Sequence, residues 1–175
     1  LERVGAHVVY GLPNLKTHAK VTLVVRNEAD GIRRYMHFGT GNYNDKTARV
    51  YTDLSLFTCR ADLGADATQL FNALTGFSKA DSYEQLMVAP TSLRSGFMEL
   101  IDRETEHAEA GRPAGIIAKL NAISDAGIVQ RRLPPRAVVL SVSHHRHGIF
   151  ASRQYRVHDV LDGVDGDLVM LDADA

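Results

Sequence analysis

His18 and Lys20 are the residues of this sequence whose types and spacing are best suited to chemistry. They stand two positions apart in the segment Leu15-Lys16-Thr17-His18-Ala19-Lys20, directly before an apolar run that reaches Val25. In an extended chain alternate side chains point to the same side, so the imidazole and the ammonium should face one ligand together. A nucleophilic nitrogen beside a fixed cation suits attack on a phosphorus centre, whose oxygens carry the negative charge.

A second motif, Gly39-Thr40-Gly41-Asn42-Tyr43-Asn44, follows about twenty residues later. Glycines on both sides of Thr40 allow successive backbone N–H groups to turn toward an anion. Thr40 and Asn42 would add side-chain donors to this cradle. The sequence therefore predicts a phosphate site built from His18, Lys20, Gly39, Thr40, Gly41 and Asn42.

Each motif alone has an ordinary explanation. A histidine beside a lysine is most often a surface feature at a strand end, and most Gly-Thr-Gly triplets are simple turns. The combination is more specific, because the two motifs are separated by the length of a β-hairpin.

Composition narrows the class of protein. The chain has 175 residues with a net charge of −1, so any affinity for a polyanion must be local, and nucleic acid is not an expected partner. Cys59 is the only cysteine, which excludes an intrachain disulfide and favours a reducing compartment. No apolar stretch is long enough for a membrane span, and the first residues do not resemble a signal peptide, so we expect a cytoplasmic location. The absence of an initiator Met suggests a segment of a longer protein.

Hydrophobic patterning predicts an α/β protein. Strands are expected at residues 7–10, 20–26, 33–38 and 54–57, with a five-residue turn at 27–31 that makes a hairpin of the second and third. A helix is predicted over residues 66–74, ending near Gly76.

The rest of the chain is predicted in two parts. Thr91 or Ser92 should begin a helix that ends at Gly111 and carries a solvated charged stripe, followed by a strand at 115–119 and another helix over 121–129. After Arg131 the pattern changes: Pro134 and Pro135 break any helix, and an apolar run at 137–142 is suited to one strand.

The long segment from Lys16 to Thr58 closely resembles the first C-terminal catalytic domain of the long, multidomain bacterial polyphosphate kinases. Residues 86–90 and 103–125 resemble the beginning of the second C-terminal domain. The likeness covers about residues 1–129 and implies a phospholipase-D-like mixed sheet flanked by helices, incomplete at the N-terminus, plus the start of a second similar α/β domain. We therefore assign residues 1–81 and 82–130 to these domains, and interpret 131–175 as an unmatched tail that is frame-shifted or disordered.

The resemblance also implies roles for single residues. His18 matches the histidine that takes the terminal phosphate of ATP and becomes a phosphohistidine, and Tyr51 matches a tyrosine that contacts the nucleotide. Lys20, Thr40 and Asn42 would line the phosphate path. Lys46 and Arg49 are further candidate contacts. His37 also matches a family histidine, although its alternation with Tyr35 along the strand suits a structural role equally well.

The same resemblance implies ATP or ADP and inorganic polyphosphate as partners, Mg²⁺ as cofactor with no ligands assignable here, and a homo-oligomer for the full-length enzyme. The second histidine of the family has no match after Gln130. We therefore expect this chain alone to be largely inactive, and the alternative to an enzyme is a phosphate- or polyphosphate-binding remnant. A third hypothesis, a metal site in the tail, would use His144, His145 and His147 together with Asp residues.

Overall fold

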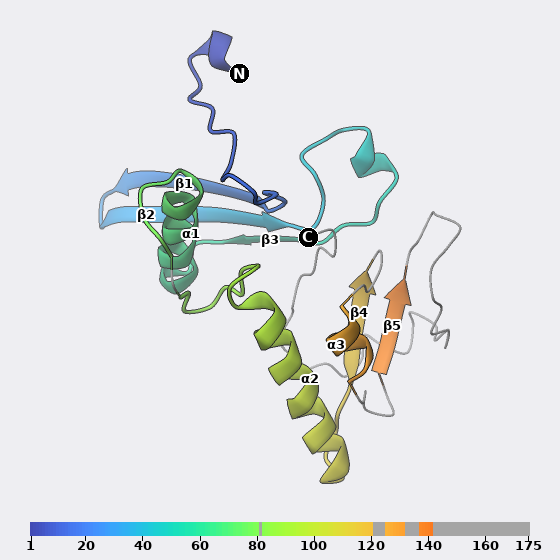
Figure 1. The fold of residues 1–175 in the computed structure, drawn as a ribbon. Helices are drawn as coiled ribbons and strands as arrows, with labels where there is room; N and C mark the ends of the chain where they lie inside the picture. Colours follow the sequence, from blue (N-terminus) through green and yellow to red (C-terminus); the bar gives the residue numbers. More distant parts are fainter. Residues whose placement is uncertain (81, 121–124, 132–136, 142–175) are drawn as a thin grey trace. The chain divides into compact units, whose positions relative to one another are not determined.

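The structure is a computed structural model that describes residues 1–80, 82–120, 125–131 and 137–141 (Figure 1). The chain divides into two compact units, one formed by residues 1–91 and one that begins at Ser92. Both contain helices and strands, so the predicted α/β class is confirmed. The predicted tail, including its histidine cluster, lies outside the described residues apart from Arg131 and 137–141.

The sheet of the first unit has three antiparallel strands in the order β1-β2-β3. They are β1 (Lys20–Glu28), β2 (Gly31–Gly39) and β3 (Ser55–Thr58). The predicted hairpin is confirmed, but its strands extend further than expected, because Glu28 pairs with Gly31 and only Ala29 and Asp30 remain in the turn. Gly31 has a φ of 116°, a conformation that a side chain would strain. Two short 3-10 helices complete the unit, η1 (Glu2–Val4) and η2 (Thr47–Arg49).

The strand predicted at residues 7–10 is wrong. This segment is not in regular structure, and Tyr10 is 88% exposed. An apolar run becomes a strand only when a neighbouring strand pairs with its backbone groups. Among the described residues, none forms a ladder with this segment.

Helix α1 (Ala61–Leu74) packs on one face of the sheet and forms most of the core (Figure 1). Leu63, Ala67 and Leu70 are buried, as are Met36 and Phe38 of β2. Gly64 permits this close approach, since a Cβ there would lie 3.2 Å from the Cβ of Arg34. We call the sheet face that bears Met36 and Phe38 the helix face.

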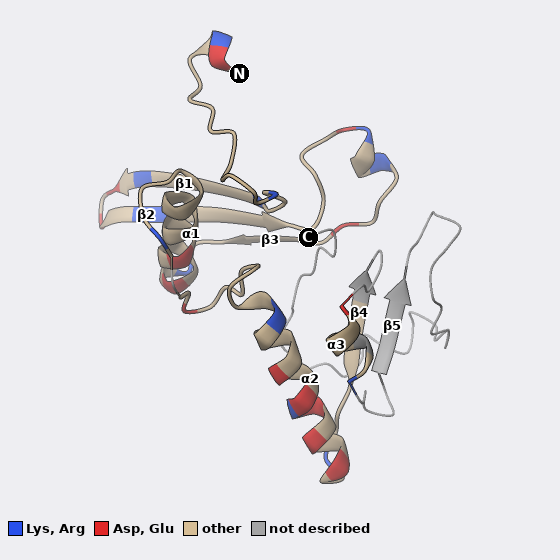
Figure 2. Ribbon diagram, viewed as in Figure 1, with Lys and Arg blue, Asp and Glu red and all other residues tan. Residues whose placement is uncertain are grey.

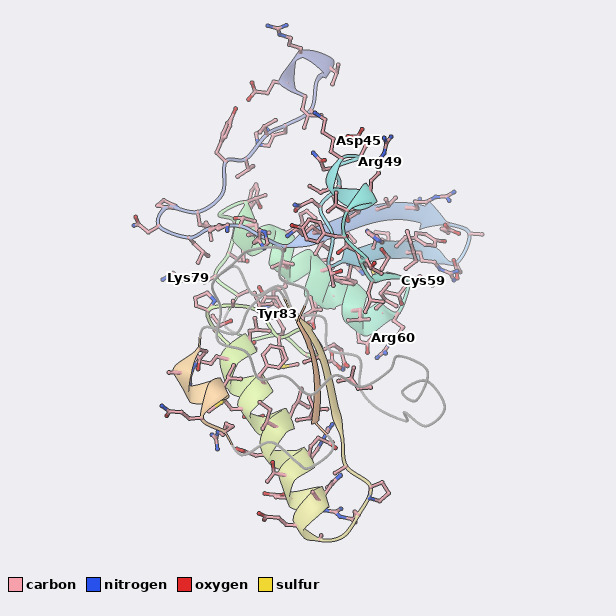
Figure 3. The ribbon with its side chains drawn as sticks, turned by 90° about the vertical axis from the view of Figure 1, so that its right-hand side faces the viewer. Asp45, Arg49, Cys59, Arg60, Lys79 and Tyr83 are labelled. Atoms are coloured by element: carbon pink, nitrogen blue, oxygen red, sulfur yellow. The ribbon has the colours of Figure 1, made fainter. Side chains whose placement is uncertain are left out.

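The helix starts five residues earlier than the predicted 66–74. Asp62 stabilises the first turn, because its Oδ1 accepts a hydrogen bond from the N–H of Leu63 at 2.8 Å. The guanidinium of Arg60 also binds this carboxylate and, with the Leu63 N–H, lowers the pKa of Asp62. Figure 3 shows Arg60 and Cys59 where β3 leads into α1. The small residues Ala61, Gly64 and Ala65 before Asp66 hid this start from the hydrophobic pattern.

Asp66 links α1 by hydrogen bonds to residues 84–86. Its side chain is only 3% exposed, and its two oxygens accept backbone N–H bonds from Glu84 (2.9 Å), Gln85 (2.7 Å) and Leu86 (2.8 Å). A buried carboxylate is tolerated when several donors replace its water shell. This interaction therefore fixes the path of residues 84–86 against the core.

The second unit contains α2 (Leu93–Glu109), β4 (Ile116–Leu120), α3 (Ala126–Val129) and β5 (Ala137–Ser141). β4 and β5 pair in parallel, as expected for strands joined through a helix. The helix after Ser92 and the strands near 115–119 and 137–142 are confirmed, and acidic residues line successive turns of α2 (Figure 2). Of the helix predicted over 121–129, the described part is α3; residues 121–124 lie outside the described residues.

Arg94 and Asp125 join α2 to α3 within this unit. Nε and Nη2 of the arginine donate to the two carboxylate oxygens at 2.7 and 3.3 Å. Asp125 also accepts the N–H of Ile128, so it caps α3 while paired. The arginine bond and the Ile128 N–H lower the pKa of Asp125.

We predict that Asp66→Asn destabilises the chain by about 1–3 kcal/mol. The asparagine NH₂ is itself a donor, so it cannot accept from the backbone N–H groups that now donate to the Asp66 carboxylate. Urea unfolding followed by circular dichroism measures this change. Asp45→Asn is the matched control, since Asp45 is exposed, and it should shift stability by less than about 0.5 kcal/mol. Equal stability of the two variants would contradict the role given to Asp66.

Candidate functional site

His18 and Lys20 contact each other at the start of β1. Nζ of Lys20 lies 3.1 Å from Nδ1 and 3.0 Å from Nε2 of the His18 ring. The prediction that the two side chains point the same way is therefore confirmed. Lys20 is 8% exposed, whereas His18 is half-buried.

The contact has a chemical consequence for the imidazole. An ammonium group can only donate hydrogen bonds, so the ring nitrogen that accepts from Lys20 must carry a lone pair. The sequence did not identify a residue that contacts the His18 ring, and the structure shows that Lys20 does. The ammonium and the imidazole thus lie side by side at the edge of the sheet.

Hydrogen bonds of the Gly39-Thr40-Gly41 turn link the end of β2 to the residues directly before β3. The Thr40 N–H donates to the Leu54 carbonyl at 3.1 Å, while the Thr40 hydroxyl accepts the Leu54 N–H at 3.0 Å and donates to Oδ1 of Asp53 at 3.1 Å. Both Thr40 donors are therefore engaged within the protein, and a ligand would have to replace Leu54 or Asp53 to use them. Asp53 was missed by sequence reasoning because its partner is thirteen positions away.

A glycine is required at position 41, because a side chain there would overlap the Asp53 carboxylate. A Cβ at Gly41 would lie 2.2 Å from Oδ2 of Asp53, far inside van der Waals contact. Gly39 leaves space for a different neighbour: a Cβ there would lie 3.1 Å from Cε1 of His37. The two glycines thus admit the Asp53 carboxylate and the His37 ring, which is a different use from the predicted anion cradle.

His37 lies on the face of the sheet opposite the helix face, which we call the His37 face and define by Lys20, Thr22, His37 and Phe57. Register places Thr22 and Phe57 directly beside His37 on the neighbouring strands. The His37 ring packs against Phe57, with the ring centroids 4.4 Å apart and the planes tilted by 36°, and its Nδ1 lies 2.7 Å from the hydroxyl of Tyr43. That hydroxyl also accepts a hydrogen bond from Thr22 at 3.0 Å.

The remaining predicted residues lie on the exposed loop between β2 and β3. Asn42, Lys46 and Arg49 are exposed, and Tyr51 is 45% exposed. Lysine and arginine give η2 a positive charge in Figure 2, and Figure 3 shows Asp45 and Arg49 together on this segment. Among the described residues, no hydrogen bond joins these four side chains to His18 or Lys20.

Asn44 shapes this loop and was not singled out from the sequence. Its side-chain oxygen accepts the N–H groups of Lys46 (3.0 Å) and Thr47 (3.1 Å), so it shapes the turn that leads into η2. An Asn followed by polar residues in a turn is a recognisable signal for this role. Tyr43 and Asp53, in contrast, act through partners that no local pattern reveals.

The described residues offer little for a metal ion. Within the described ranges, no three His, Cys, Asp or Glu side chains converge as a candidate site. These residues therefore do not form a protein cage for the Mg²⁺ that the family resemblance implies. No described helix is long and apolar enough to cross a membrane.

Comparison with known proteins gives a consistent result over most of the chain. The family model for polyphosphate kinase C-terminal domain 1 matches residues 1–80, and the model for C-terminal domain 2 matches residues 86–134. A polyphosphate kinase of Thermosynechococcus vestitus is 58% identical over 130 residues, and one of Streptomyces coelicolor is 52% identical over 129 residues. These matches cover 74% of this chain but only 18% and 17% of the relatives.

A solved structure is also similar. The crystal structure of polyphosphate kinase from Porphyromonas gingivalis matches 73% of this chain, and 22% of its own, with a TM-score of 0.64 and 32% sequence identity. The expected α/β fold of a polyphosphate kinase segment is thereby confirmed. The sheet was predicted to be mixed, but in the described part of the first unit it is antiparallel throughout, because neighbouring strands β1, β2 and β3 run in alternating directions.

We predict that Gly41→Ala disrupts the Thr40–Asp53 contact and destabilises the chain by about 1–3 kcal/mol, because the new methyl group would displace the carboxylate. Faster amide hydrogen exchange at Thr40 and Leu54 would report the disruption directly. In an Asp53→Ala background, the same glycine substitution should have a much smaller effect, since the displaced oxygen is gone. Equal effects in both backgrounds would contradict this origin for the glycine.

Proposed function

Because this chain belongs to the polyphosphate kinase family, we propose that its first unit accepts the terminal phosphate of ATP on His18 and passes it to polyphosphate. The observation that carries this proposal is the contact of Lys20 with both ring nitrogens of His18, at 3.0 and 3.1 Å. The chain spans 18% of the length of the Thermosynechococcus relative. The complete reaction cycle is therefore proposed for a full-length enzyme, and only the phosphate-accepting site for this chain.

The proposed reaction has two transfers. A ring nitrogen of His18 attacks the γ-phosphorus of ATP, and a P–N bond forms as the bond to the bridging oxygen breaks and ADP leaves. A terminal oxygen of polyphosphate then attacks the same phosphorus, and the P–N bond breaks. The reverse sequence makes ATP. Each transfer requires an unprotonated imidazole nitrogen, either as nucleophile or as leaving group.

Lys20 has a specific place in this sequence of events. In the structure its ammonium lies against the nitrogens that would attack, so it must move from the ring to a phosphate oxygen when the ligand arrives. That exchange exposes the imidazole lone pair and gives the phosphate a positively charged partner at the same time. Lys20 would then stabilise the charge on the transferred group.

The exposed loop would bind the rest of the substrate. Tyr51 offers an aromatic side chain for the nucleotide, while Lys46, directly before η2, and Arg49 within it can contact phosphate oxygens of ATP or polyphosphate. Asn42 would contribute a side-chain donor, and Gly39, Gly41 and Thr40 would shape the path. Mg²⁺, the cytoplasmic location and the homo-oligomer remain predictions, and no step above uses the metal ion.

A second candidate function is polyphosphate binding without turnover. The small share of the relatives that this chain covers favours it, because a phosphoryl-transfer site needs groups that handle the leaving group and exclude water. We accordingly propose that this polypeptide alone turns over ATP negligibly, since loss of one member of a cooperating set typically lowers the rate by orders of magnitude.

We predict that the chain incubated with γ-labelled ATP acquires an acid-labile, base-stable label that His18→Ala abolishes and His37→Ala reduces less. His7→Ala is the control, because His7 is exposed in the segment before the sheet and should keep the label. Equal losses from the first two variants, with native circular dichroism, would refute the assignment of His18 as acceptor. An unlabelled chain that still binds polyphosphate would favour the second candidate.

A further inference from the structure

The Thr22–Tyr43–His37 contacts form a chain of hydrogen bonds across the His37 face. Tyr43 comes from the loop after β2, and its hydroxyl reaches back over the strands to Thr22 on β1 and His37 on β2. The centroids of the Tyr43 and His37 rings are 5.5 Å apart. One phenol therefore contacts both strands of the hairpin.

The direction of these bonds sets the proton on His37. The Thr22 hydroxyl donates to the Tyr43 oxygen at 3.0 Å, which leaves the single phenolic hydrogen for the second partner, Nδ1 of His37 at 2.7 Å. A nitrogen that accepts this hydrogen carries none of its own. In the neutral ring the proton then sits on Nε2.

Nε2 lies near the end of the sheet where His18 and Lys20 meet. A Cβ built at Gly39 would be 3.1 Å from Cε1 and 3.7 Å from Nε2 of His37, so this ring edge overlies Gly39. Gly39 is the register partner of Lys20. Among the described residues, Nε2 of His37 has no hydrogen-bond partner, so its N–H is available to a ligand.

We propose that Tyr43 is a positioning residue that holds His37 in the Nε2–H form, so that His37 donates a hydrogen bond to a phosphate oxygen bound beside Lys20. The ligand class, an oxygen of ATP or of a polyphosphate chain, rests on the proposed function. The protonation of His37 does not, because it follows from Thr22 and Tyr43 alone.

The test is nitrogen NMR of the full chain, labelled with ¹⁵N at histidine and kept at mildly alkaline pH so that imidazoles are neutral. The His37 signals are assigned by their loss in His37→Gln. We expect Nδ1 unprotonated and Nε2 protonated in the unaltered chain. A protonated Nδ1 would overturn the inference, because Tyr43 would then be the acceptor.

Tyr43→Phe removes only the hydroxyl, and it should give a mixture of the two ring forms and weaken binding of inorganic tripolyphosphate about three- to tenfold. Thr22→Val should act in the same direction, whereas Thr22→Ser, which keeps the donor, should restore the original behaviour. Tyr10→Phe is the matched control, because the Tyr10 hydroxyl bonds only to exposed Glu2 among the described residues. A change in affinity with an unaltered His37 ring form would overturn the positioning role.

If the unaltered chain does not bind tripolyphosphate but shows the expected ring form, which Tyr43→Phe alters, the assignment of Tyr43 stands and the proposed function of this chain fails. The two conclusions are thus separated by the same set of samples.

Discussion

The candidate site depends on the register of the β1–β2 hairpin. Lys20 opposes Gly39 and Thr22 opposes His37 only when Glu28 opposes Gly31 at the turn. A slip of one residue would turn His37 toward α1 and expose Met36 and Phe38, which are 2% and 7% exposed in the structure. Burial of apolar side chains on the helix face therefore fixes the positions of the polar side chains on the opposite face.

Some polar groups of the loop between β2 and β3 hold the loop in shape, and others are available to bind a ligand. Thr40, Asp53 and Asn44 use their hydrogen bonds to shape the loop. The Asn42 side chain and Nε2 of His37 form no hydrogen bond of this kind among the described residues, so they are better suited to bind a ligand. A motif that looks like a set of phosphate donors in sequence is therefore, in part, the framework that holds other donors in place.

Sequence reasoning found the elements that local patterns determine. Alternating apolar residues and a turn predicted the hairpin, and helical spacing after Ser92 predicted α2. It failed at residues 7–10, where the apolar run has no strand beside it among the described residues. It also missed the start of α1, where small residues weaken the hydrophobic pattern and Arg60 and Asp62 stabilise the first turn.

The site shows the same division between local and distant effects. His18 and Lys20 were placed together from their spacing alone, because two positions in an extended chain share one side. Tyr43, Asp53 and Asp66 could not be assigned roles in advance, since their partners come from other strands or from segments thirteen to twenty positions away. The family resemblance supplied a chemical role for His18 but not the residue that contacts its ring.

The most direct test of the central claim, that one end of the first unit's sheet binds phosphate chains, is a titration of the ¹⁵N-labelled full chain with inorganic tripolyphosphate, followed by backbone amide shifts. We predict that the largest shifts cluster at Lys20, Gly39 and Asn42, and that they weaken with added salt. Largest shifts at Arg94 or Arg103 of the second unit, with Lys20 and Gly39 unmoved, would contradict the account.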